Sequence, residues 1–156
     1  MPTTSIPPHI HEAIETGSFE AALGATLDYF GCQAGTVHVL PASSPESELQ
    51  LAAHRGIPPP VVTIVQKVPI GKGIAGLAAE RREPITLCNL QTDTSGQARP
   101  AAKTTGMEGS IAVPMLTTEG ELRGVLGIAK ASAHDWSPAE TGLLLAIARV
   151  MAGMQV

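Results

Sequence analysis

The segment from Val68 to Ile85, V-P-I-G-K-G-I-A-G-L-A-A-E-R-R-E-P-I, constrains the fold more than any other part of the chain. Its glycines follow the spacing G-x-G-x-x-G, which occurs in loops that bind dinucleotides between a buried parallel strand and a helix. Here Pro69 stands where a central strand would need its N–H. Asp93, which is 20 residues after Gly73, lies in a polar stretch and not at a strand end. The P-loop pattern also fails, because Lys72 precedes a glycine instead of Ser or Thr.

A structural role accounts for these glycines better. Gly71 and Gly73 allow the chain to turn sharply into a helix, and Gly76 allows that helix to lie close to a sheet. Two arginines suit the C-terminal end of the helix dipole, and Pro84 ends the helix. A free anion at the helix N-terminus stays open as a minor alternative.

The rest of the chain predicts segregated helices and strands. Apolar periodicity indicates helices over 9–16, over 19–30 between Ser18 and Gly31, and from Ser137, which opens a capping box, to about Met154. Strands are predicted over 35–40, 49–56, 85–88, 110–116 and 121–131, while 61–68 has no clear assignment and 89–109 is a long polar excursion. This order favours an α+β fold with an antiparallel sheet.

The first two strands show alternating side chains, which predicts two different faces. One face is expected to be core, and its residues are Val37, Val39, Leu49, Leu51 and Ala53. The other face is mixed, and its residues are Thr36, His38, Gln50, Ala52 and His54. A metal site between His38 and His54 is a weaker interpretation than two hydrogen-bonded or exposed histidines.

Composition excludes several classes of protein. The net charge is −4 and basic residues form no large cluster, so no nucleic-acid partner is expected. No apolar run approaches the length of a membrane span, and the N-terminus lacks the features of a signal peptide, so no membrane association is expected. The two cysteines, Cys32 and Cys88, lack metal-type spacing, which favours the reducing cytoplasm.

Four segments in order resemble GAF domains. They are V-P-I-G-K-G-I-A-G-L-A-A-E-R-R-E-P-I, S-I-A-V-P-M-L, L-R-G-V-L-G-I-A-K and D-W-S-P-A-E-T-G-L-L-L-A-I-A, and the resemblance spans about residues 18–153. It implies a central antiparallel sheet of about six strands, with the N- and C-terminal helices on one face and a pocket helix and lid on the other. We expect a flexible segment over 1–8 and a single GAF domain over 9–156, with no output domain in the chain.

The resemblance also implies a ligand pocket beside the glycine-led helix. The expected pocket residues are His38, Ala52, Ile74, Leu77, Cys88, Met107, Ala112 and Leu126. The excursion over 89–109 is long enough to act as a lid, although a surface loop without function is the alternative. The expected lid residues are Asn89, Asp93, Arg99 and Lys103.

The known chemistries of GAF relatives do not transfer readily to this chain. Free methionine sulfoxide reductases need cysteines in the glycine-led helix and in the excursion, and this chain has none there. Haem- and bilin-binding relatives place His or Cys in the excursion, which holds Lys103 and Met107 instead. The N-K-F-D-E signature of cyclic-nucleotide-binding members is also absent. The cofactor therefore stays unknown, and neither catalysis nor a metal site is expected.

The closing helix predicts an interface. Its apolar residues circle much of its surface, so a second subunit would cover the side that the sheet leaves open. The alternative is that the first helices cover it within one chain. The expected dimer residues are Leu143, Leu144, Ile147 and Met151.

The sequence thus predicts a regulatory, small-molecule-binding homodimer whose ligand orders the lid and shifts the terminal helices toward a separate signalling output protein. A dimerisation or scaffold module with a collapsed pocket is the second interpretation, since Ala75, Ala112 and Gly127 would let the helix pack flush on the sheet. A redox enzyme like the sulfoxide reductases is a weaker third.

Overall fold

A computed structural model describes residues 5–41, 48–89, 91–92 and 105–154. Its helices are α1 (Pro8–Glu15), α2 (Phe19–Phe30), α3 (Pro59–Ile64), α4 (Gly73–Arg81) and α6 (Pro138–Met151). Its strands are β1 (Ala34–Val39), β2 (Glu48–Arg55), β3 (Lys67–Pro69), β4 (Ile85–Leu87), β5 (Gly109–Leu116) and β6 (Leu122–Lys130). The segment 61–68, left open by the sequence, therefore contains the end of α3 and the start of β3.

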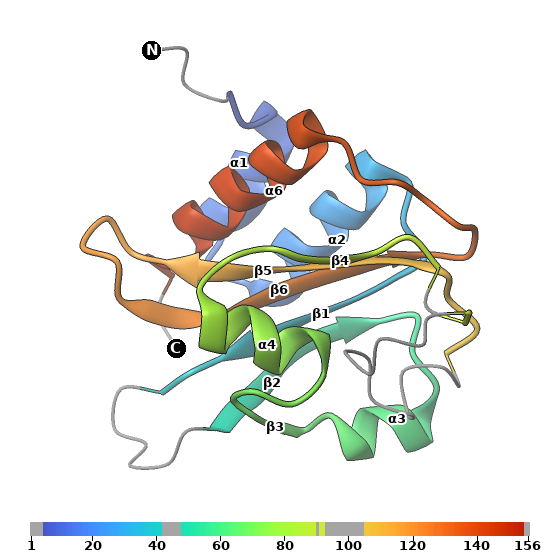
Figure 1. Cartoon of the computed structure of the whole chain (residues 1–156). Coiled ribbons are helices and arrows are strands. Elements are labelled where there is room, and N and C mark those ends of the chain that lie inside the picture. Colours follow the sequence, from blue (N-terminus) through green and yellow to red (C-terminus); the bar gives the residue numbers. More distant parts are fainter. Residues whose placement is uncertain (1–4, 42–47, 90, 93–104, 155–156) are drawn as a thin grey trace.

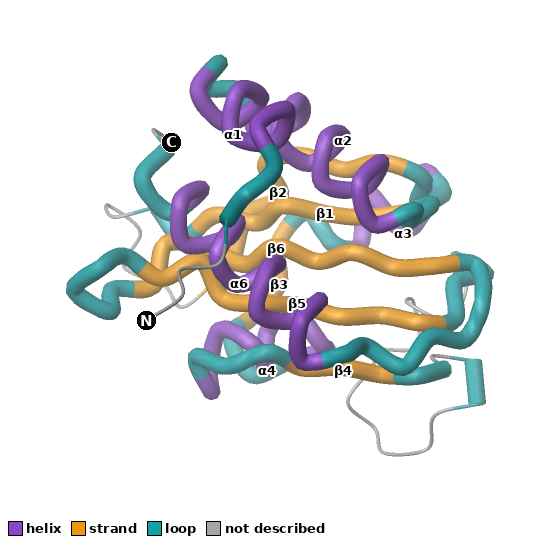
Figure 2. The backbone as a smooth tube through the Cα atoms, turned by 90° about the horizontal axis from the view of Figure 1, so that it is seen from above, coloured by secondary structure: helices purple, strands orange, loops and turns teal. Residues whose placement is uncertain are grey.

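The six strands form one sheet in the order β3-β2-β1-β6-β5-β4, and every neighbouring pair is antiparallel. Helices α1, α2 and α6 cover one face, and α3 and α4 lie on the other (Figure 1). Seen from the helix-covered side, the strands run side by side beneath α1, α2 and α6 (Figure 2). The predicted α+β architecture is therefore confirmed.

Local signals set the ends of the helices. The Ser18 hydroxyl accepts a hydrogen bond from the Ala21 N–H at 3.1 Å and caps α2, and Gly31 ends that helix with a left-handed φ of 67°. Ser137 and Glu140 form the predicted capping box of α6. The described part of the chain contains no helix that is both long and apolar enough to cross a membrane.

The glycine-rich segment joins β3 to α4. Because β3 pairs antiparallel with β2, the segment does not follow a parallel strand. Gly71 and Gly73 have φ values of 96° and 70°, which L side chains rarely adopt. The Gly71 N–H donates to the Gly76 carbonyl at 2.8 Å, so the loop closes on the start of α4. A Cβ atom at Gly76 would lie 2.5 Å from the Pro69 carbonyl oxygen. These contacts confirm the structural interpretation of the motif.

Arginine 82 joins α4 to a distant hairpin. It caps α4 in a left-handed conformation with a φ of 55°. Its guanidinium Nη1 donates to the Gly120 carbonyl, in the turn between β5 and β6, at 2.6 Å. The C-terminal end of α4 is therefore attached to the turn of the longest hairpin in the sheet.

A bulge in β2 overturns part of the predicted facing. Val37 pairs with Ala53, but His38 pairs with Leu51, so Ala52 is an extra residue in its strand. The extra residue reverses the alternation, and Leu49 packs with the apolar cluster on the α4 side of the sheet, not with Val37 and Ala53 on the other side. The expected single core face through Val37, Leu49, Leu51 and Ala53 was wrong for this reason.

The closing helix is covered within the chain. Leu144, Ile147 and Met151 have no exposed surface and belong to the core formed by α1, α2, α6 and the sheet. Leu143 is half-buried and packs against the same core. The three fully buried side chains are therefore not available to a partner, while the homodimer and a place for Leu143 in its interface stay predictions.

Candidate functional site

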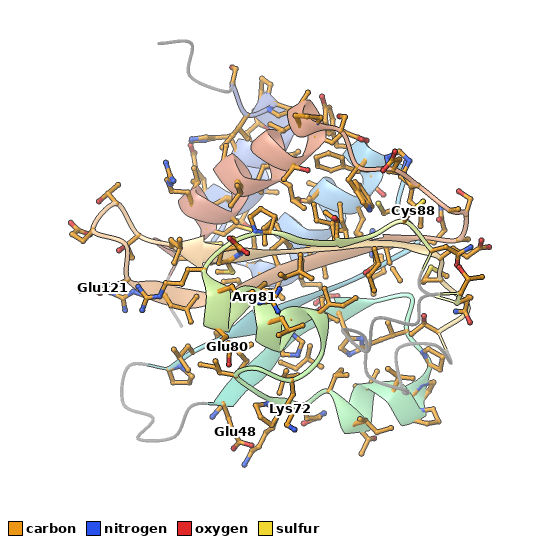
Figure 3. All side chains as sticks on the ribbon, viewed as in Figure 1. Glu48, Lys72, Glu80, Arg81, Cys88 and Glu121 are labelled. Carbon is orange, nitrogen blue, oxygen red and sulfur yellow. The ribbon has the colours of Figure 1, made fainter. Side chains whose placement is uncertain are left out.

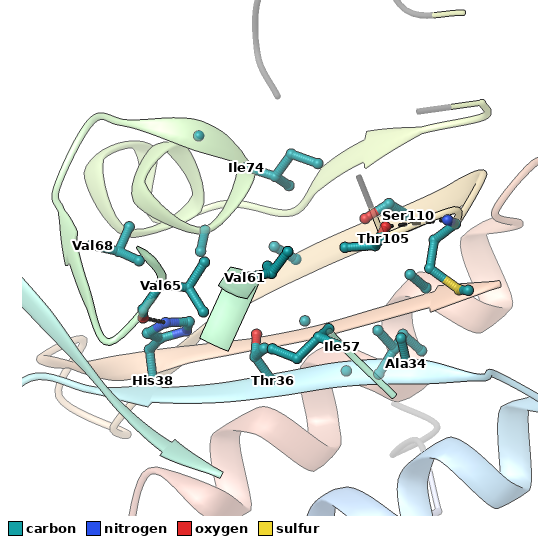
Figure 4. A pocket seen from close by; sticks show the side chains of 18 of the residues that line it. Ala34, Thr36, His38, Ile57, Val61, Val65, Val68, Ile74, Thr105 and Ser110 are labelled. Carbon is teal, nitrogen blue, oxygen red and sulfur yellow. Dashed lines mark hydrogen bonds between the residues drawn. The ribbon is translucent and has the colours of Figure 1, made fainter. Parts of the chain in front are cut away.

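A cavity of about 150 Å³ lies between the sheet and the segments that carry α3 and α4. Figure 4 shows side chains from β1, β5, the α3 region and α4 converging on it. The cavity is therefore lined by elements that are far apart in the sequence.

Small side chains make the floor. Thr36 on β1 and Ala112 on β5 both pair with Gly127 on β6, and all three residues line the cavity. Ala34 and Ala129, two residues farther along the same strands, pair with each other and also line the cavity. Because these side chains are short, the sheet does not reach the elements above it, and space is left between them.

Branched apolar side chains make the walls. Val61, Val65 and Val68 come from α3 and the segment that follows it, and Ile74 comes from the first turn of α4. Val61, Val65 and Ile74 line the cavity on the side opposite the sheet, and Val68 lines it from β3 at the edge of the sheet (Figure 4). Such a lining is typical of sites for small organic ligands, which are mostly apolar with a few polar groups.

His38 is the polar group most deeply buried in the lining. Its side chain is 2% exposed, and Nε2 lies 2.8 Å from the Val65 carbonyl oxygen. A carbonyl oxygen only accepts, so Nε2 carries the proton and Nδ1 is left as an acceptor. Nδ1 is buried without a hydrogen-bond partner among the described residues. Burial lowers the pKa of His38, although the Val65 hydrogen bond opposes this, so the ring is neutral near pH 7.

The two ends of the long excursion meet at the rim of the cavity. Thr105 and Met107 contribute to the lining. The Asn89 side-chain amide donates to Glu108 Oε1 at 3.1 Å, and Gln91 Nε2 donates to the Met107 carbonyl at 2.8 Å. Of the expected lid residues, Asp93, Arg99 and Lys103 lie outside the described part of the chain.

Four of the eight expected pocket residues line the cavity: His38, Ile74, Met107 and Ala112. Leu126 does not, because it pairs with Val37 and points into the helix-covered core. Ala52 is exposed at the bulge, and Cys88 is exposed beyond the end of β4. Leu77 packs in the apolar cluster beside α4 and is not part of the lining.

Sequence reasoning missed most of the walls and floor. Val61 and Val65 were missed because no secondary structure was assigned to their segment. Thr36 was placed on the correct face but was not selected as a lining residue. The small residues on adjacent strands, Thr36, Ala112 and Gly127, were the available signal, and they indicate an open floor as readily as the expected flush packing.

The base of the excursion is hydrogen-bonded to the loop that leads into α6. The His134 N–H donates to the Cys88 carbonyl at 3.0 Å, and the Gly109 N–H donates to the Ser132 carbonyl at 3.0 Å. The His134 Nε2 lies 3.0 Å from the Glu140 carboxylate in the first turn of α6. Burial alone would raise the pKa of the Glu140 carboxyl, but hydrogen bonds from the Ser137 N–H and His134 outweigh it and hold that pKa below its ordinary value.

The other reactive side chains do not form a second site. No group of three or more His, Cys, Asp or Glu residues able to hold a metal ion occurs in the described ranges. Burial raises the pKa of the Cys32 thiol to about 11, so this thiol is protonated near pH 7. Cys88 is exposed, and neither cysteine lines the cavity. Figure 3 shows Cys88 well away from α4, at the edge where the excursion begins.

Comparisons with known proteins agree on the fold. A family model described as GAF domain matches residues 16–154. No curated protein sequence matches the chain. The GAF domain of an Acinetobacter phosphoenolpyruvate-protein phosphotransferase is 19% identical over 93% of this chain and 87% of that one, with a TM-score of 0.73.

Two further solved structures come from proteins with other names. A type II free methionine-R-sulfoxide reductase from Thermoplasma acidophilum is 18% identical, covers 94% of both chains and has a TM-score of 0.71. A domain of a two-component sensor histidine kinase protein from Sinorhizobium meliloti 1021 is 20% identical over 94% of this chain and 90% of that one, with a TM-score of 0.64. At these identities the likeness shows the fold alone.

Proposed function

Because the chain belongs to the GAF domain family, we propose that it is a regulatory module that holds a small molecule between its sheet and α4. The single observation that carries this proposal is the apolar cavity of about 150 Å³ with the buried, unpartnered His38 Nδ1 in its lining. A buried polar atom without a partner is unfavourable unless something completes its hydrogen bonding. A ligand that displaced the atoms covering Nδ1 would do so.

The route from the cavity to α6 suggests how binding is communicated. Met107 lines the cavity, and its neighbour Glu108 donates a backbone hydrogen bond to Lys130 at 2.7 Å. The loop after Lys130 carries His134, which contacts both the Cys88 carbonyl and Glu140 on α6. A ligand that shifts Met107 therefore pulls on a loop that is held to the first turn of α6, and α6 would carry the change to a signalling partner.

A thermal-shift series on the full chain tests the proposal. A ligand present at about 100 times its Kd adds about 2.7 kcal/mol to the free energy of unfolding, which raises the Tm by several degrees. The series contains cyclic nucleotides, amino acids, 2-oxo acids, haem and uncharged single-ring compounds. The proposal is supported if one of these raises the Tm of the native chain and Gly127→Val, which fills the floor, abolishes the rise.

Gly142→Ala is the matched control, because the added Cβ would have nothing within 4 Å beyond its chain neighbours and the backbone of its own helix, and the position on α6 is outside the lining. It should keep the full ligand response. If no compound stabilises the chain, and native mass spectrometry of freshly purified protein finds no carried-over ligand, the regulatory proposal fails in favour of a scaffold without ligand. The same spectrum reports whether the chain forms the homodimer that the sequence predicts.

We further propose that the chain acts without catalysis. The reductases of this fold are the competing case, since several solved structures similar to this chain carry that activity. The Cys32 thiol is protonated near pH 7 and Cys88 lies outside the cavity lining, which disfavours a thiol–disulfide cycle at the site. Reduction of free methionine sulfoxide that is lost in Cys88→Ser would overturn this proposal.

A further inference from the structure

The cavity has the size of one small ring. Its volume is about 150 Å³, and a cavity of that volume is large enough to admit benzene. The walls contributed by Val61, Val65 and Ile74 offer only carbon atoms from their side chains. A ligand must therefore present mostly apolar surface to them.

Charge is disfavoured inside the cavity. Among the described lining residues, Lys72 carries the only permanent charge, and it is exposed at the mouth. Figure 3 shows Lys72 at the outer side of the loop before α4. A phosphate or carboxylate placed in the interior would lose water without gaining an opposite charge from the described lining residues.

One hydrogen-bond acceptor is available where the lining is most buried. The His38 ring is held in place by the bond from Nε2 to the Val65 carbonyl at 2.8 Å, so Nδ1 has a defined direction. Nδ1 accepts and does not donate in this tautomer. Nδ1 is itself covered by neighbouring atoms, so a ligand reaches it only by displacing them, and a ligand that does so must bring an O–H or N–H donor.

We propose that the cavity binds an uncharged molecule of about one aromatic ring that donates a hydrogen bond to His38 Nδ1. This proposal rests on the proposed function and specifies its ligand as a phenol- or indole-like compound. It distinguishes the site from one built for cyclic nucleotides or other anions. The probes are phenol, which has the donor, toluene, which has the same size without it, and benzoate, which carries a charge.

The test measures binding of each probe to the full chain by nuclear magnetic resonance titration, with the Val61 and Ile74 methyl groups as reporters. Phenol should bind about three- to tenfold more tightly than toluene, which is the effect of one hydrogen bond. Benzoate should bind more weakly than both. Phenol should also move the nitrogen resonance of His38 Nδ1, and toluene should not.

Three variants separate the role of His38 from a general effect on the fold. His38→Leu should bind toluene and lose the preference for phenol, and His38→Gln, which keeps an acceptor and a donor, should retain part of it. Gly142→Ala, on α6 and outside the lining, should leave the phenol-to-toluene ratio unchanged.

Equal binding of phenol and toluene to the native chain, or a phenol preference that survives in His38→Leu, would overturn the inference while the proposed function stands. Tighter binding of benzoate than of phenol would do the same. If no probe perturbs the reporters and the Tm series is also negative, the proposed function fails with it.

Discussion

The two faces of the sheet use neighbouring residues of the same strands and reach opposite results. On the face under α1, α2 and α6, Ile111, Leu126 and Ile128 are fully buried in a continuous core. On the other face, Ala112 and Gly127 leave a cavity below α3 and α4. Because successive side chains of a strand point to opposite faces, their sizes on the two faces are independent of each other. On the face with the smaller side chains, space is left for a ligand.

The largest expected effect comes from emptying the packed face. Leu126→Ala removes a side chain with no exposed surface, and we expect the free energy of unfolding to fall by about 3 kcal/mol because the surrounding core cannot collapse fully. Urea unfolding measures the change. Thr36→Val on the cavity face should change the same quantity by less than about 0.5 kcal/mol. Similar losses in both variants would contradict the comparison.

The next effect concerns the helices that cover the two faces. Gly76→Ala on α4 should lower the free energy of unfolding by about 2–3 kcal/mol, because its Cβ would meet the Pro69 carbonyl oxygen at 2.5 Å. Gly142→Ala on α6 has open space and should raise stability by up to about 1 kcal/mol. If Gly76→Ala left the free energy of unfolding unchanged but lowered the affinity for inorganic phosphate, an anion-binding role for the glycine loop would be favoured.

A matched pair of glycines compares the faces directly. A Cβ at Gly35 would lie 2.9 Å from Leu27 Cδ2 and 2.8 Å from the Gly127 carbonyl, so Gly35→Ala should cost about 2 kcal/mol. A Cβ at Gly127 meets nothing closer than Thr36 Oγ1 at 3.5 Å, so Gly127→Ala should stabilise by about 0.5–1 kcal/mol. Denaturant midpoints measure the stability of both variants. If Gly127→Ala proved less stable than Gly35→Ala, the cavity face would not be open.

The smallest expected effect is a pH dependence of the cavity face. Burial lowers the pKa of His38 below the ordinary 6.5, with the Val65 hydrogen bond opposing. As the pH falls through 6.5, the unfolded chain takes up a proton that folded His38 resists, so stability is complete above that pH and falls below it until the folded pKa is passed. The slope is at most about 1.4 kcal/mol per pH unit for one proton.

The other histidines also titrate, so the difference between the native chain and His38→Gln isolates the contribution of His38. Urea midpoints between about pH 5 and pH 8 measure it. Lys72 is the other charged group in the described lining, and no carboxylate occurs there to offset protonation. An identical pH profile in the two proteins would mean that His38 is not shielded from water.

Much of the fold could be predicted because its signals are local. The Ser18 cap, the Ser137 capping box and the hairpin of β5 and β6 depend on residues close in sequence, and each lies where expected. The helix-covered core also follows from simple alternation and periodicity. The resemblance then supplied the arrangement of the elements around the sheet.

The cavity was harder to predict because it depends on the register of the strands and on side chains that are too small to fill the space above them. The extra residue at Ala52 leaves no mark in an alternating pattern, yet it reverses the direction of Leu49 and Leu51. The apolar side chain of Leu126 is compatible with either face of the sheet, and only its pairing with Val37 assigns it to the core. The apolar surface of α6 was also ambiguous: Leu144, Ile147 and Met151 pack in the core within the chain, whereas Val150 is 38% exposed.

The bulge in β2 makes one strand a member of both apolar clusters. Leu49 and Ala53 are four residues apart and would point the same way in a regular strand, but they pack on opposite sides. Inserting or deleting one residue within this strand would therefore turn its side chains to the opposite face and disturb both apolar clusters at once. Length changes in β2 should be tolerated far less than the same changes in the turn at Gly120, whose added atoms would enter solvent.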